Sequence, residues 1–508
     1  MKKVLLTILD GVGLTEEKKG NAFYEAKTPN FDYLWNNYPH MKLEASGLAV
    51  GIPAGQMGNS EVGHTNIGAG RIVYQSLVKI NNSIKDGTFY NNEAFQKAIK
   101  NCKENNSSLH LLGLVSDGGI HSHIEHLKGL LRLCQRENFN NVYIHALLDG
   151  RDTEPLVAPK YIEELKNTIK ETGIGKIVTI GGRYYAMNRD RNWKLTEMAY
   201  NAIINGESKI NVKTTEEAFQ KEYDSNNTDE FMEPTVLESI KVLDNDSMIM
   251  FNFRSDRMIQ LLRSLKDPEF KEFKTRKIDL LLVTMTDYEQ NDRYENLHIA
   301  YPPEELNNTL GEYISNLGFK QLRLSEYEKS GHITFYFSGC SEKIYKLEDR
   351  KIFERSKVFT YDEDPKMRSY DITEYLINSL GKYELIVTNY PNGDALGHTG
   401  VYPKVIEGIE ELDKCLGRLI KEVDLEEYIW ILTADHGNCE KMIDPDGTPN
   451  KMHTTNLVPF IIMNKNYYLN ENKIGKLSDI APTILKIMNL DIPKEMTGEV
   501  LIDESGEE

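Results

Sequence analysis

The stretch KKVLLTILDGVG, residues 2–13, is an almost continuous apolar run that stops at Asp10. Two later stretches follow the same plan: YELIVTNYPNGD leads to Asp394, and YIWILTADHGN leads to Asp435 and His436. Runs that are apolar at nearly every position are typical of strands buried on both faces, as in parallel α/β sheets. Ligands of such sheets bind beyond the carboxyl ends of the strands. These stretches therefore predict an α/β fold with functional residues directly after its strands.

The middle of the chain contains a second set of strand-like runs. They include SSLHLLGLVSDGGIHSH, NNVYIHALLDGRD, GKIVTIGGRYY, DSMIMFNFRSDR and KIDLLLVTMTDY, within residues 107–288. Because helical patterns lie between runs of this kind, they predict another α/β unit. The proline-rich stretch AYPPEE near residue 300 is a candidate linker, so we expect two α/β units in the chain.

The length and the charge of the chain limit its organisation and its partners. At 508 residues it is too long for one ordinary hydrophobic core, which predicts two or more domains. Its formal net charge of −18 argues against a nucleic-acid partner, because binding to phosphate backbones needs a basic surface. A small anionic ligand is compatible with this charge if arginines gather locally.

Cysteine usage and the first residues indicate a compartment. The five cysteines are scattered and lack metal-finger spacing, and they are too few for a disulfide framework, which favours a reducing cytoplasm. The first residues resemble a signal peptide, but Asp10 interrupts the short apolar run and no small-residue cleavage site follows. No apolar stretch is long enough to cross a bilayer. We therefore expect a cytoplasmic protein without a membrane partner.

The stretch AGQMGNSEVGHTNIGAG, residues 54–70, surrounds the single serine Ser60 with glycines. Taken alone, a glycine-rich stretch is usually a surface turn. Glycine also lets neighbouring groups approach closely, which suits a loop that presents a hydroxyl. A serine hydroxyl is a poor nucleophile at neutral pH, and a bound divalent ion can lower its pKa. A metal site close to Ser60 would therefore make it a nucleophile.

Carboxylates and imidazoles near the two ends of the chain are candidates for that metal site. DALGH places Asp394 and His398 four residues apart, on one side of a helical turn. Taken singly, Asp10 reads as an ordinary turn residue and His453 as an ordinary surface residue. The candidates are Asp10, Asp394, His398, Asp435, His436 and His453. Mixed oxygen and nitrogen ligands favour Mn, Zn or Fe over Ca, and six ligands suit two ions.

Arginines follow three of the strand-like runs in the middle of the chain. The candidates are Arg151, Arg183, Arg189, Arg254 and Arg257, together with His121 and Asp152. Any one of these arginines could be a surface salt-bridge partner. Several strand ends that all carry arginine predict a small substrate with more than one anionic group, because arginine binds carboxylate and phosphate in bidentate fashion.

With these residues in hand, the sequence resembles the cofactor-independent (2,3-bisphosphoglycerate-independent) phosphoglycerate mutases, which are alkaline phosphatase-like metalloenzymes. The resemblance covers nearly the whole chain and rests on LDGVG, GQMGNSEVGHTNIGAGR, SDGGIHSH, HALLDGRDT, GGRYYAMNRD, FNFRSDR, NGDALGHTG and TADHGN in this order. The chain departs from the usual form in SEYEKSGHITFYFSGC, which ends in Cys340 where a second glycine is common. Residues 340–353 are also divergent, and their role is left open.

The resemblance implies interconversion of 3-phosphoglycerate and 2-phosphoglycerate in glycolysis and gluconeogenesis, without added 2,3-bisphosphoglycerate. Ser60 would be the nucleophile of a phosphoserine intermediate, Lys329 would reach the phosphoryl group, and Asp152 would carry protons. One ion would be held by Asp394, His398 and His453, and the other by Asp10, Ser60, Asp435 and His436. The substrate would be bound by His121, Arg151, Asp152, Arg183, Arg189, Arg254, Arg257 and Lys329. Mn²⁺ is the expected metal, and Zn²⁺ or Co²⁺ would accept similar ligands.

The order of these residues along the chain predicts an inserted domain. Asp10 and Ser60 lie near the amino terminus, whereas the other metal-ligand candidates lie beyond residue 390. One site forms only if the first and last segments fold together. We therefore predict a discontinuous phosphatase-like metal-binding domain, residues 1–74 and 304–508, and an inserted α/β substrate-binding domain, residues 75–303.

Another metal-dependent phosphatase or phosphomutase of the same superfamily is the alternative. A phosphopentomutase would have a smaller inserted domain, and a simple phosphomonoesterase would not need the arginine-rich unit. A sulfatase would need its nucleophile in a Cys/Ser-x-Pro-x-Arg setting, which Ser60 lacks. A metal-binding regulatory protein without catalysis would not need the serine. Because no coiled coil or exposed apolar helix is evident, we expect a monomer.

Overall fold

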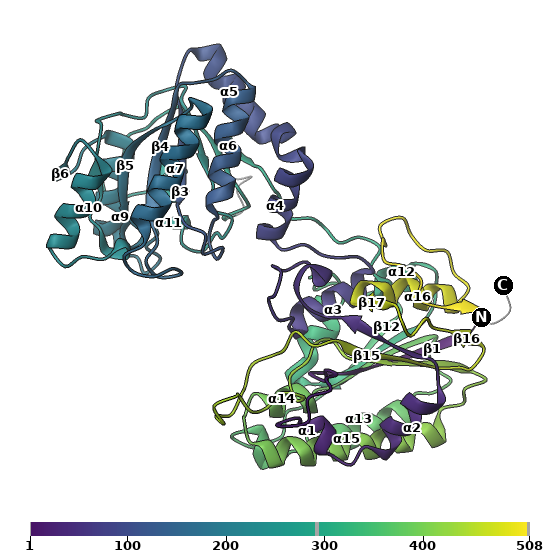
Figure 1. Cartoon of the computed structure of the whole chain (residues 1–508). Helices are drawn as coiled ribbons and strands as arrows, with labels where there is room; N and C mark the ends of the chain where they lie inside the picture. Colours follow the sequence, from purple (N-terminus) through teal and green to yellow (C-terminus); the bar gives the residue numbers. More distant parts are fainter. Residues whose placement is uncertain (1, 290–293, 505–508) are drawn as a thin grey trace. The chain divides into compact units, whose positions relative to one another are not determined.

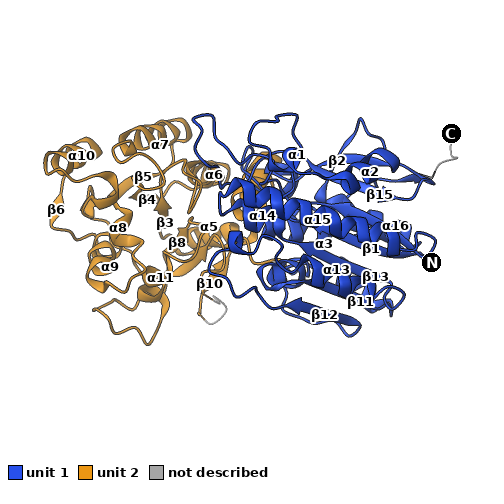
Figure 2. Cartoon of the chain, turned by 90° about the horizontal axis from the view of Figure 1, so that it is seen from below, with its two compact units in different colours: residues 1–75, 305–508 blue, residues 76–304 orange. Residues whose placement is uncertain are grey.

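The computed structural model describes residues 2–289 and 294–504. The chain divides into two compact units, which we call unit 1 (residues 1–75 and 305–508) and unit 2 (residues 76–304), and Figure 2 colours them separately. Both units combine a mostly parallel sheet with helices, which confirms the predicted α/β class.

Among the described residues, unit 1 has an eight-stranded sheet in the order β12-β11-β13-β1-β14-β15-β2-β17. Its strands are β1 (Lys3–Leu9), β2 (His40–Glu44), β11 (Gln321–Glu326), β12 (Glu348–Phe353), β13 (Leu385–Tyr390), β14 (Tyr428–Thr433), β15 (Val458–Met463) and β17 (Ile474–Lys476). A separate pair joins β16 (Tyr467–Tyr468) to β18 (Asp503–Glu504). The amino-terminal strand β1 is parallel to β13 on one side and to β14 on the other, and β11 is parallel to β13. The carboxyl ends of four neighbouring strands therefore meet at one edge of the sheet.

Helices cover both faces of the unit 1 sheet. They are α1 (Ala22–Glu25), α2 (Pro29–Asn37), α3 (Ser60–Ala69), α12 (Leu310–Asn316), α13 (Ser369–Ile377), α14 (Asn392–Gly397), α15 (Tyr402–Glu422) and α16 (Ile480–Ile487), with the short turns η1 (Gly47–Val50), η6 (Tyr327–Lys329), η7 (His332–Tyr336), η8 (Tyr361–Glu363) and η9 (Leu477–Asp479). Figure 1 shows α2, α13 and α15 on one face, and α3, α12 and α16 on the other. Helix α15 begins with Pro403 in its first turn and buries Val405, Leu412 and Leu419 along one side, as its helical pattern predicts.

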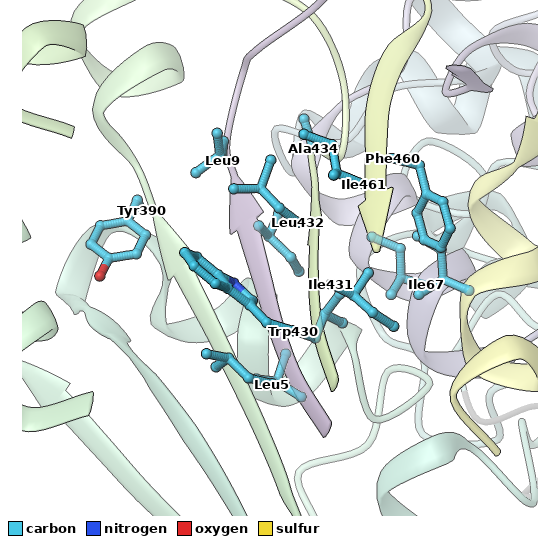
Figure 3. Packing of buried hydrophobic residues seen from close by; sticks show 14 of the residues in the cluster. Leu5, Leu9, Ile67, Tyr390, Trp430, Ile431, Leu432, Ala434, Phe460 and Ile461 are labelled. Atoms are coloured by element: carbon cyan, nitrogen blue, oxygen red, sulfur yellow. The ribbon is translucent and has the colours of Figure 1, made fainter. Parts of the chain in front are cut away.

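The core of unit 1 lies on both sides of the central strands, as the continuous apolar runs predict. Every residue of β14 is buried, and so is every residue of β13. Trp430 is one of the largest fully buried side chains, and its indole N–H donates to Thr7 Oγ1 over 3.0 Å. Figure 3 shows Trp430 packed among Leu5, Leu432 and other apolar residues of the central strands. This packing fixes the positions of the strand ends, where the functional candidates begin.

Unit 2 has its own sheet, with the strand order β10-β9-β8-β3-β4-β5-β7-β6 among the described residues. The strands are β3 (Leu109–Leu114), β4 (Val142–Leu148), β5 (Lys176–Gly182), β6 (Ile210–Asn211), β7 (Thr235–Val236), β8 (Ser247–Met250), β9 (Leu281–Thr284) and β10 (Leu297–Ile299). From β10 to β5 all neighbours are parallel, so these carboxyl ends also share one edge.

Two apolar clusters cover the two faces of the unit 2 sheet. The helices are α4 (Ser76–Asp86), α5 (Glu93–Asn105), α6 (Ile124–Arg136), α7 (Ala158–Thr172), α8 (Arg183–Ala186), α9 (Trp193–Tyr200), α10 (Thr215–Asp224) and α11 (Ile259–Lys266), with the turns η2 (Thr88–Asn91), η3 (Asn201–Asn205) and η4 (Asp229–Phe231). One cluster joins the sheet to α5, α6 and α7, and the other joins it to α9 and α11.

Three other features of the described ranges bear on the expectations from sequence. The helices there are too short or too polar to span a bilayer. All five cysteines are free thiols. Cys340 has a backbone φ of 61°, a left-handed conformation that favours glycine. The glycine that the resemblance implies at this position would adopt this conformation without strain.

Candidate active site

The carboxyl ends of four neighbouring strands of unit 1 carry the residues that the sequence singled out. In sheet order, β11 leads to Lys329, β13 leads to Asp394, β1 leads to Asp10, and β14 leads to Asp435 and His436. Parallel pairing puts these ends side by side, which is where open α/β sheets bind ligands. The strand order alone therefore brings together residues that are up to 426 positions apart in sequence.

Ser60 is the first residue of α3, and its side chain is buried. Asn59 caps the helix by accepting a hydrogen bond from the backbone N–H of Val62 over 2.9 Å. The Ser60 hydroxyl donates to Asp10 Oδ1 over 3.2 Å and lies 2.9 Å from His436 Nε2. Gly63, one turn later, would place a Cβ atom 2.6 Å from the carbonyl oxygen of Asp435. A glycine there lets α3 approach the loop after β14, which explains part of the glycine-rich pattern.

Lys329 lies at the centre of this cluster. Its Nζ donates to Ser60 Oγ over 2.6 Å and to Asp394 Oδ2 over 2.6 Å, and it lies 2.8 Å from Asp10 Oδ1. Burial lowers the pKa of Lys329, but Asp10 and Asp394 outweigh burial and hold its pKa above the ordinary value. Burial likewise raises the pKa of Asp10 and Asp394, and Lys329 outweighs burial and holds both pKa values below the ordinary one. The three groups are therefore charged at neutral pH.

Three histidines of the cluster share one orientation. Nδ1 of His398 lies 2.9 Å from the carbonyl oxygen of Lys451, Nδ1 of His453 lies 2.8 Å from that of Gly58, and Nδ1 of His436 lies 3.2 Å from that of Gly437. A carbonyl oxygen only accepts, so in each ring Nδ1 donates and Nε2 carries the free lone pair when the ring is neutral. Histidines that bind metals usually donate their second ring N–H to a carbonyl or carboxylate in this way.

Three ligand atoms lie close together at the exposed side of the cluster. His398 Nε2 lies 3.0 Å from His453 Nε2, and the two atoms lie 3.1 and 3.0 Å from Asp394 Oδ1. Two neutral imidazole lone pairs that face each other at this distance repel unless a cation lies between them. Ligand atoms at right angles around one ion, each about 2.1 Å from it, are about 3 Å apart. The spacing therefore fits one small cation bound by Asp394, His398 and His453.

The deeper side of the cluster is rich in negative charge. Asp435 Oδ2 is buried without a hydrogen-bond donor, although His64 Nδ1 lies 3.2 Å and His436 Nε2 lies 3.5 Å from it. Burial lowers the pKa of His436, but Asp435 and Asp10 outweigh burial and raise it to about 10. The cluster thus attracts positive charge, and the residues present fit divalent ions. By distance alone, the ligand atoms group as Asp394 with His436 and His453, and as Asp10 with His64 and Asp435.

Three buried polar residues of this cluster escaped the sequence analysis. His64 is on the α3 face of Ser60, and its Nε2 lies 3.1 Å from Asn389 Nδ2. Asn389 Nδ2 donates to Asp10 Oδ2 over 2.7 Å, and Asn438 Nδ2 donates to Asp394 Oδ1 over 3.1 Å. The i, i+4 spacing from Ser60 to His64 and the position of Asn438 after DHG were the available signals.

The other site candidates lie in unit 2, again beyond strand ends. Arg183, directly after β5, is buried, and its Nη1 donates to Asp149 Oδ1 over 2.7 Å and to Asp152 Oδ2 over 2.5 Å. Arg254 Nε and Arg189 Nη1 both contact Asp256, over 3.2 and 2.8 Å. Asp149 and Asp256 were not predicted from sequence, and each holds arginines in place.

The remaining unit 2 candidates complete a positively charged cluster. Arg151 Nη1 lies 3.4 Å from Glu230 Oε1, and about half of the Arg151 side chain is exposed. Burial lowers the pKa of Arg257, and the charges of Arg189, Arg183 and Arg151 lower it further, which indicates that these guanidinium groups face one region. Guanidinium groups gathered in this way fit an anionic ligand.

His121 lies within the same cluster. Its Nε2 is 3.9 Å from Asp152 Oδ2, its Nδ1 is 3.9 Å from Asp256 Oδ1, and its side chain is buried. Burial and the charge of Arg183 lower the pKa of His121 to about 4. At neutral pH this imidazole is therefore uncharged and able to donate one hydrogen bond and accept another. Of the candidates, His121, Asp152 and the five arginines lie in unit 2, and Ser60, Lys329 and the metal-ligand candidates lie in unit 1.

The buried histidines of unit 2 predict that stability falls in mild acid. Burial lowers the pKa of His126 to about 3, and its Nε2 lies 2.9 Å from Asn81 Oδ1. Below about pH 6.5 the unfolded chain binds a proton on this histidine and the folded chain does not. The free energy of unfolding therefore decreases by about 1.4 kcal/mol for each unit that the pH falls below about 6.5, down to the folded pKa.

The variant His126→Gln retains an N–H donor toward Asn81 but has no titrating group. Denaturant unfolding at several pH values from neutral to mildly acidic should give a shallower loss of stability for the variant, by about 1.4 kcal/mol per pH unit. At slightly alkaline pH, His126 is neutral in both the folded and the unfolded chain. A difference in the free energy of unfolding between the variant and the unmodified chain then reports packing alone. If the free energy of unfolding depends on pH equally in the two proteins, the lowered pKa of His126 is contradicted.

Comparisons with known proteins identify the family. The family model described as BPG-independent PGAM N-terminus matches residues 80–290, and the model described as type I phosphodiesterase / nucleotide pyrophosphatase matches residues 269–453. The 2,3-bisphosphoglycerate-independent phosphoglycerate mutase of Clostridium perfringens (strain 13) is 48% identical over 511 residues, and the match covers 99% of each chain. The protein of the same name from Clostridium botulinum (strain ATCC 19397) is 49% identical over 510 residues, again with 99% of each chain covered.

A solved structure agrees with these relatives. A phosphoglycerate mutase of Leishmania mexicana, determined at low cobalt concentration, superposes with a TM-score of 0.56 at 29% identity, over 99% of this chain and 98% of that one. The family and its alkaline phosphatase-like relatives imply divalent metal ions, and the donor set of unit 1 fits them. The chain belongs to the family of 2,3-bisphosphoglycerate-independent phosphoglycerate mutases, which are isomerases.

Proposed function

We propose that this chain interconverts 3-phosphoglycerate and 2-phosphoglycerate through a phosphoserine at Ser60, without added 2,3-bisphosphoglycerate. Membership of the family supports the reaction. The observation that supports a metal-dependent transfer most directly is the triangle of His398 Nε2, His453 Nε2 and Asp394 Oδ1, whose edges are 3.0 to 3.1 Å. A bound cation would be shared by the two imidazole lone pairs and the carboxylate oxygen, so the arrangement fits a metal site.

We assign two divalent ions to unit 1, most simply Mn²⁺, while Zn²⁺ or Co²⁺ would accept the same donors. The residues proposed to hold the first ion are Asp394, His398 and His453, and those proposed to hold the second are Asp10, Ser60, Asp435 and His436. When bound, such ions supply Lewis acidity, which favours the ionised form of the Ser60 hydroxyl and offsets the charge of the phosphoryl group.

The first half of the reaction uses Ser60 and Lys329. Ser60 Oγ attacks the phosphorus atom, a new Oγ–P bond forms, and the bond between phosphorus and the glycerate oxygen breaks. The departing oxygen takes a proton, which is assigned to Asp152 as carrier, so that glycerate gains a free hydroxyl and stays bound. Lys329 carries a positive charge at neutral pH, as its raised pKa indicates, and lies 2.6 Å from Ser60 Oγ. It therefore stabilises the negative charge that gathers on the transferring group.

The second half reverses these bonds at the other hydroxyl of glycerate. That hydroxyl attacks the phosphoserine, its proton is released, and Ser60 Oγ is regenerated. We assign Asp152 as the proton carrier for the two glycerate hydroxyls; the neutral His121 lies nearby, with Nε2 3.9 Å from Asp152 Oδ2. The five arginines of unit 2 are assigned to the carboxylate and phosphate of the substrate, since bidentate guanidinium contacts would hold glycerate during the exchange. Unit 2 thus serves for substrate binding, and unit 1 for phosphoryl transfer.

Metal removal tests this function directly. After treatment with EDTA the full chain should show no interconversion of the two phosphoglycerates, and addition of Mn²⁺ should restore it without 2,3-bisphosphoglycerate. Phosphorus NMR of the mixture distinguishes the two isomers from inorganic phosphate. Release of inorganic phosphate alone would favour a phosphatase, which is the alternative within the superfamily. Full activity after complete metal removal would overturn the metal-dependent mechanism.

The expected domain limits, residues 1–74 with 304–508 and residues 75–303, are proposed as the functional domains. A monomeric state and a cytoplasmic location stay predictions.

A further inference from the structure

Glu440 is a buried carboxylate that the proposed reaction does not use. It lies in the loop after β14, five residues beyond Asp435, and is 1% exposed. Four donors surround it. Oε2 accepts from the backbone N–H of Gly13 over 3.1 Å and from that of Asn438 over 2.8 Å. Oε1 accepts from Asn456 Nδ2 over 2.9 Å and from the hydroxyl of Thr454.

The charge of Glu440 is balanced by these donors rather than by an ion pair. Within the described ranges, no lysine, arginine or histidine nitrogen lies at ion-pair distance from its carboxylate. A buried carboxylate that satisfies both oxygens with neutral donors is stable only in that arrangement, because each lost donor leaves a desolvated charge unpaired. The loops that supply the donors are therefore held at fixed positions around it.

Two glycines of the sequence motifs leave room for this carboxylate. A Cβ atom on Gly13, in LDGVG, would lie 2.3 Å from Glu440 Oε1, and a Cβ atom on Gly437, in DHGN, would lie at the same distance from the same oxygen. Such distances are far inside van der Waals contact. The two motifs thus have glycine where the Glu440 side chain passes.

Each segment that binds Glu440 carries proposed metal ligands. Gly13 follows Asp10 by three residues, and Asn438 follows His436 by two. Thr454 is the neighbour of His453, and its backbone N–H donates to the carbonyl oxygen of Gly437 over 3.0 Å. The rings of His436 and His453 stack with centroids 4.0 Å apart. Asn438, held by Glu440 through its backbone, also donates to Asp394 Oδ1. One side chain thus joins loops from three parts of the chain.

We propose that Glu440 is a positioning residue of the metal centre. It fixes the position of the His453 loop relative to the loops that carry Asp10 and His436. The inference rests on the proposed metal-dependent function. Glu440 contacts neither the substrate nor an ion in this role. It acts through the backbone of Gly13 and Asn438 and through Thr454 and Asn456.

Glu440→Gln is the decisive variant because it retains the shape of the side chain. An amide NH₂ group in place of one carboxylate oxygen would turn two hydrogens toward existing donors, so at least one pair of hydrogen bonds is lost. The His453 loop should then loosen. We expect the affinity for Mn²⁺ to fall about 10- to 100-fold, the usual effect of losing an outer partner of a metal site.

The matched control is Asp413→Asn. Asp413, in α15, is also buried, and it accepts from the backbone N–H groups of Asn30 and Phe31 over 3.2 and 2.8 Å; these donors belong to α2 and not to the loops that carry the proposed ligands. The Asp413→Asn variant should be less stable than the unmodified chain but should bind Mn²⁺ with the same affinity. Mn²⁺ alone is titrated into each full-length protein after EDTA treatment and dialysis, and free Mn²⁺ is followed by electron paramagnetic resonance.

The activity assay adds a second readout. Excess Mn²⁺ should restore much of the turnover of Glu440→Gln, because the ligands themselves are intact. A milder variant, Thr454→Val, removes one donor and should weaken Mn²⁺ binding by a smaller factor, so the inference is tested even if Glu440→Gln does not fold. If both variants bind Mn²⁺ as tightly as Asp413→Asn, Glu440 is structural only and the inference is wrong. If the unmodified chain binds no Mn²⁺, the proposed metal centre fails, and this inference fails with it.

Discussion

Ser60→Ala should lower mutase turnover by at least about a thousandfold, since loss of a catalytic nucleophile typically has effects of this size or larger. The hydroxyl lies 2.6 Å from Lys329 Nζ, 2.9 Å from His436 Nε2 and 3.2 Å from Asp10 Oδ1. Alanine removes the oxygen that these three groups surround. The helix should persist, because alanine is a strong helix former and Asn59 still caps α3.

Two measurements distinguish the loss of the nucleophile from a defect in folding. Turnover is measured with both phosphoglycerates, and intact-protein mass spectrometry after a rapid acid quench reports a covalent phosphoryl group. The unmodified chain should show that added mass and the variant should not. Thr65→Ala is the matched control in the same helix, where the hydroxyl donates to the carbonyl oxygen of Glu61 and not to the Ser60 cluster. Turnover of Ser60→Ala within about tenfold of the unmodified chain would exclude Ser60 as the nucleophile.

The strand ends of unit 1 could be predicted because the signal is local and physical. Asp10, Asp394 and Asp435 each follow an apolar run that is buried on both faces in the structure. Parallel strands have their carboxyl ends at one edge, so residues after such runs are candidates for one site without knowledge of the strand order. The runs of unit 2 that lead to Arg151, Arg183 and Arg254 follow the same rule.

Some residues hold the site residues in place but do not directly follow a strand end. These residues could not be predicted in this way. Asn389 is the fifth residue of β13, and His64 lies in the middle of α3, where a polar residue has many possible partners. Their contacts depend on β13 being the neighbour of β1 and on how closely α3 approaches β14. Glu440 depends on three loops at once. Such contacts are set by tertiary packing, which no periodicity in the sequence records. The catalytic and binding roles assigned to the site residues stay predictions.

Lys329→Met should lower turnover by about 10²- to 10³-fold, the effect expected when one preorganised group that stabilises transition-state charge is lost. Lys329 Nζ lies 2.8 Å from Asp10 Oδ1 and 2.6 Å from Asp394 Oδ2, and both carboxylates are buried. Methionine has a similar length but no charge, so it leaves these carboxylates without their ammonium partner. The loss should appear mainly in kcat, because the substrate carboxylate is assigned to the arginines of unit 2.

The same variant tests the electrostatics of the cluster independently of turnover. Without added metal it should be less stable by about 3–5 kcal/mol, the effect of removing one partner of a buried ion pair. Mn²⁺ should reduce this deficit, because divalent ions would compensate the carboxylates that Lys329 no longer faces. Lys128→Met is the matched control, since Lys128 is also buried and contacts two carboxylates, those of Glu125 and Glu164, in unit 2. The difference in stability between Lys128→Met and the unmodified chain should be the same with and without Mn²⁺, because both proteins keep the metal ligands. If Lys329→Met retains the turnover of the unmodified chain, or if Mn²⁺ leaves its stability deficit relative to that chain unchanged, the charged centre around Ser60 does not work as proposed.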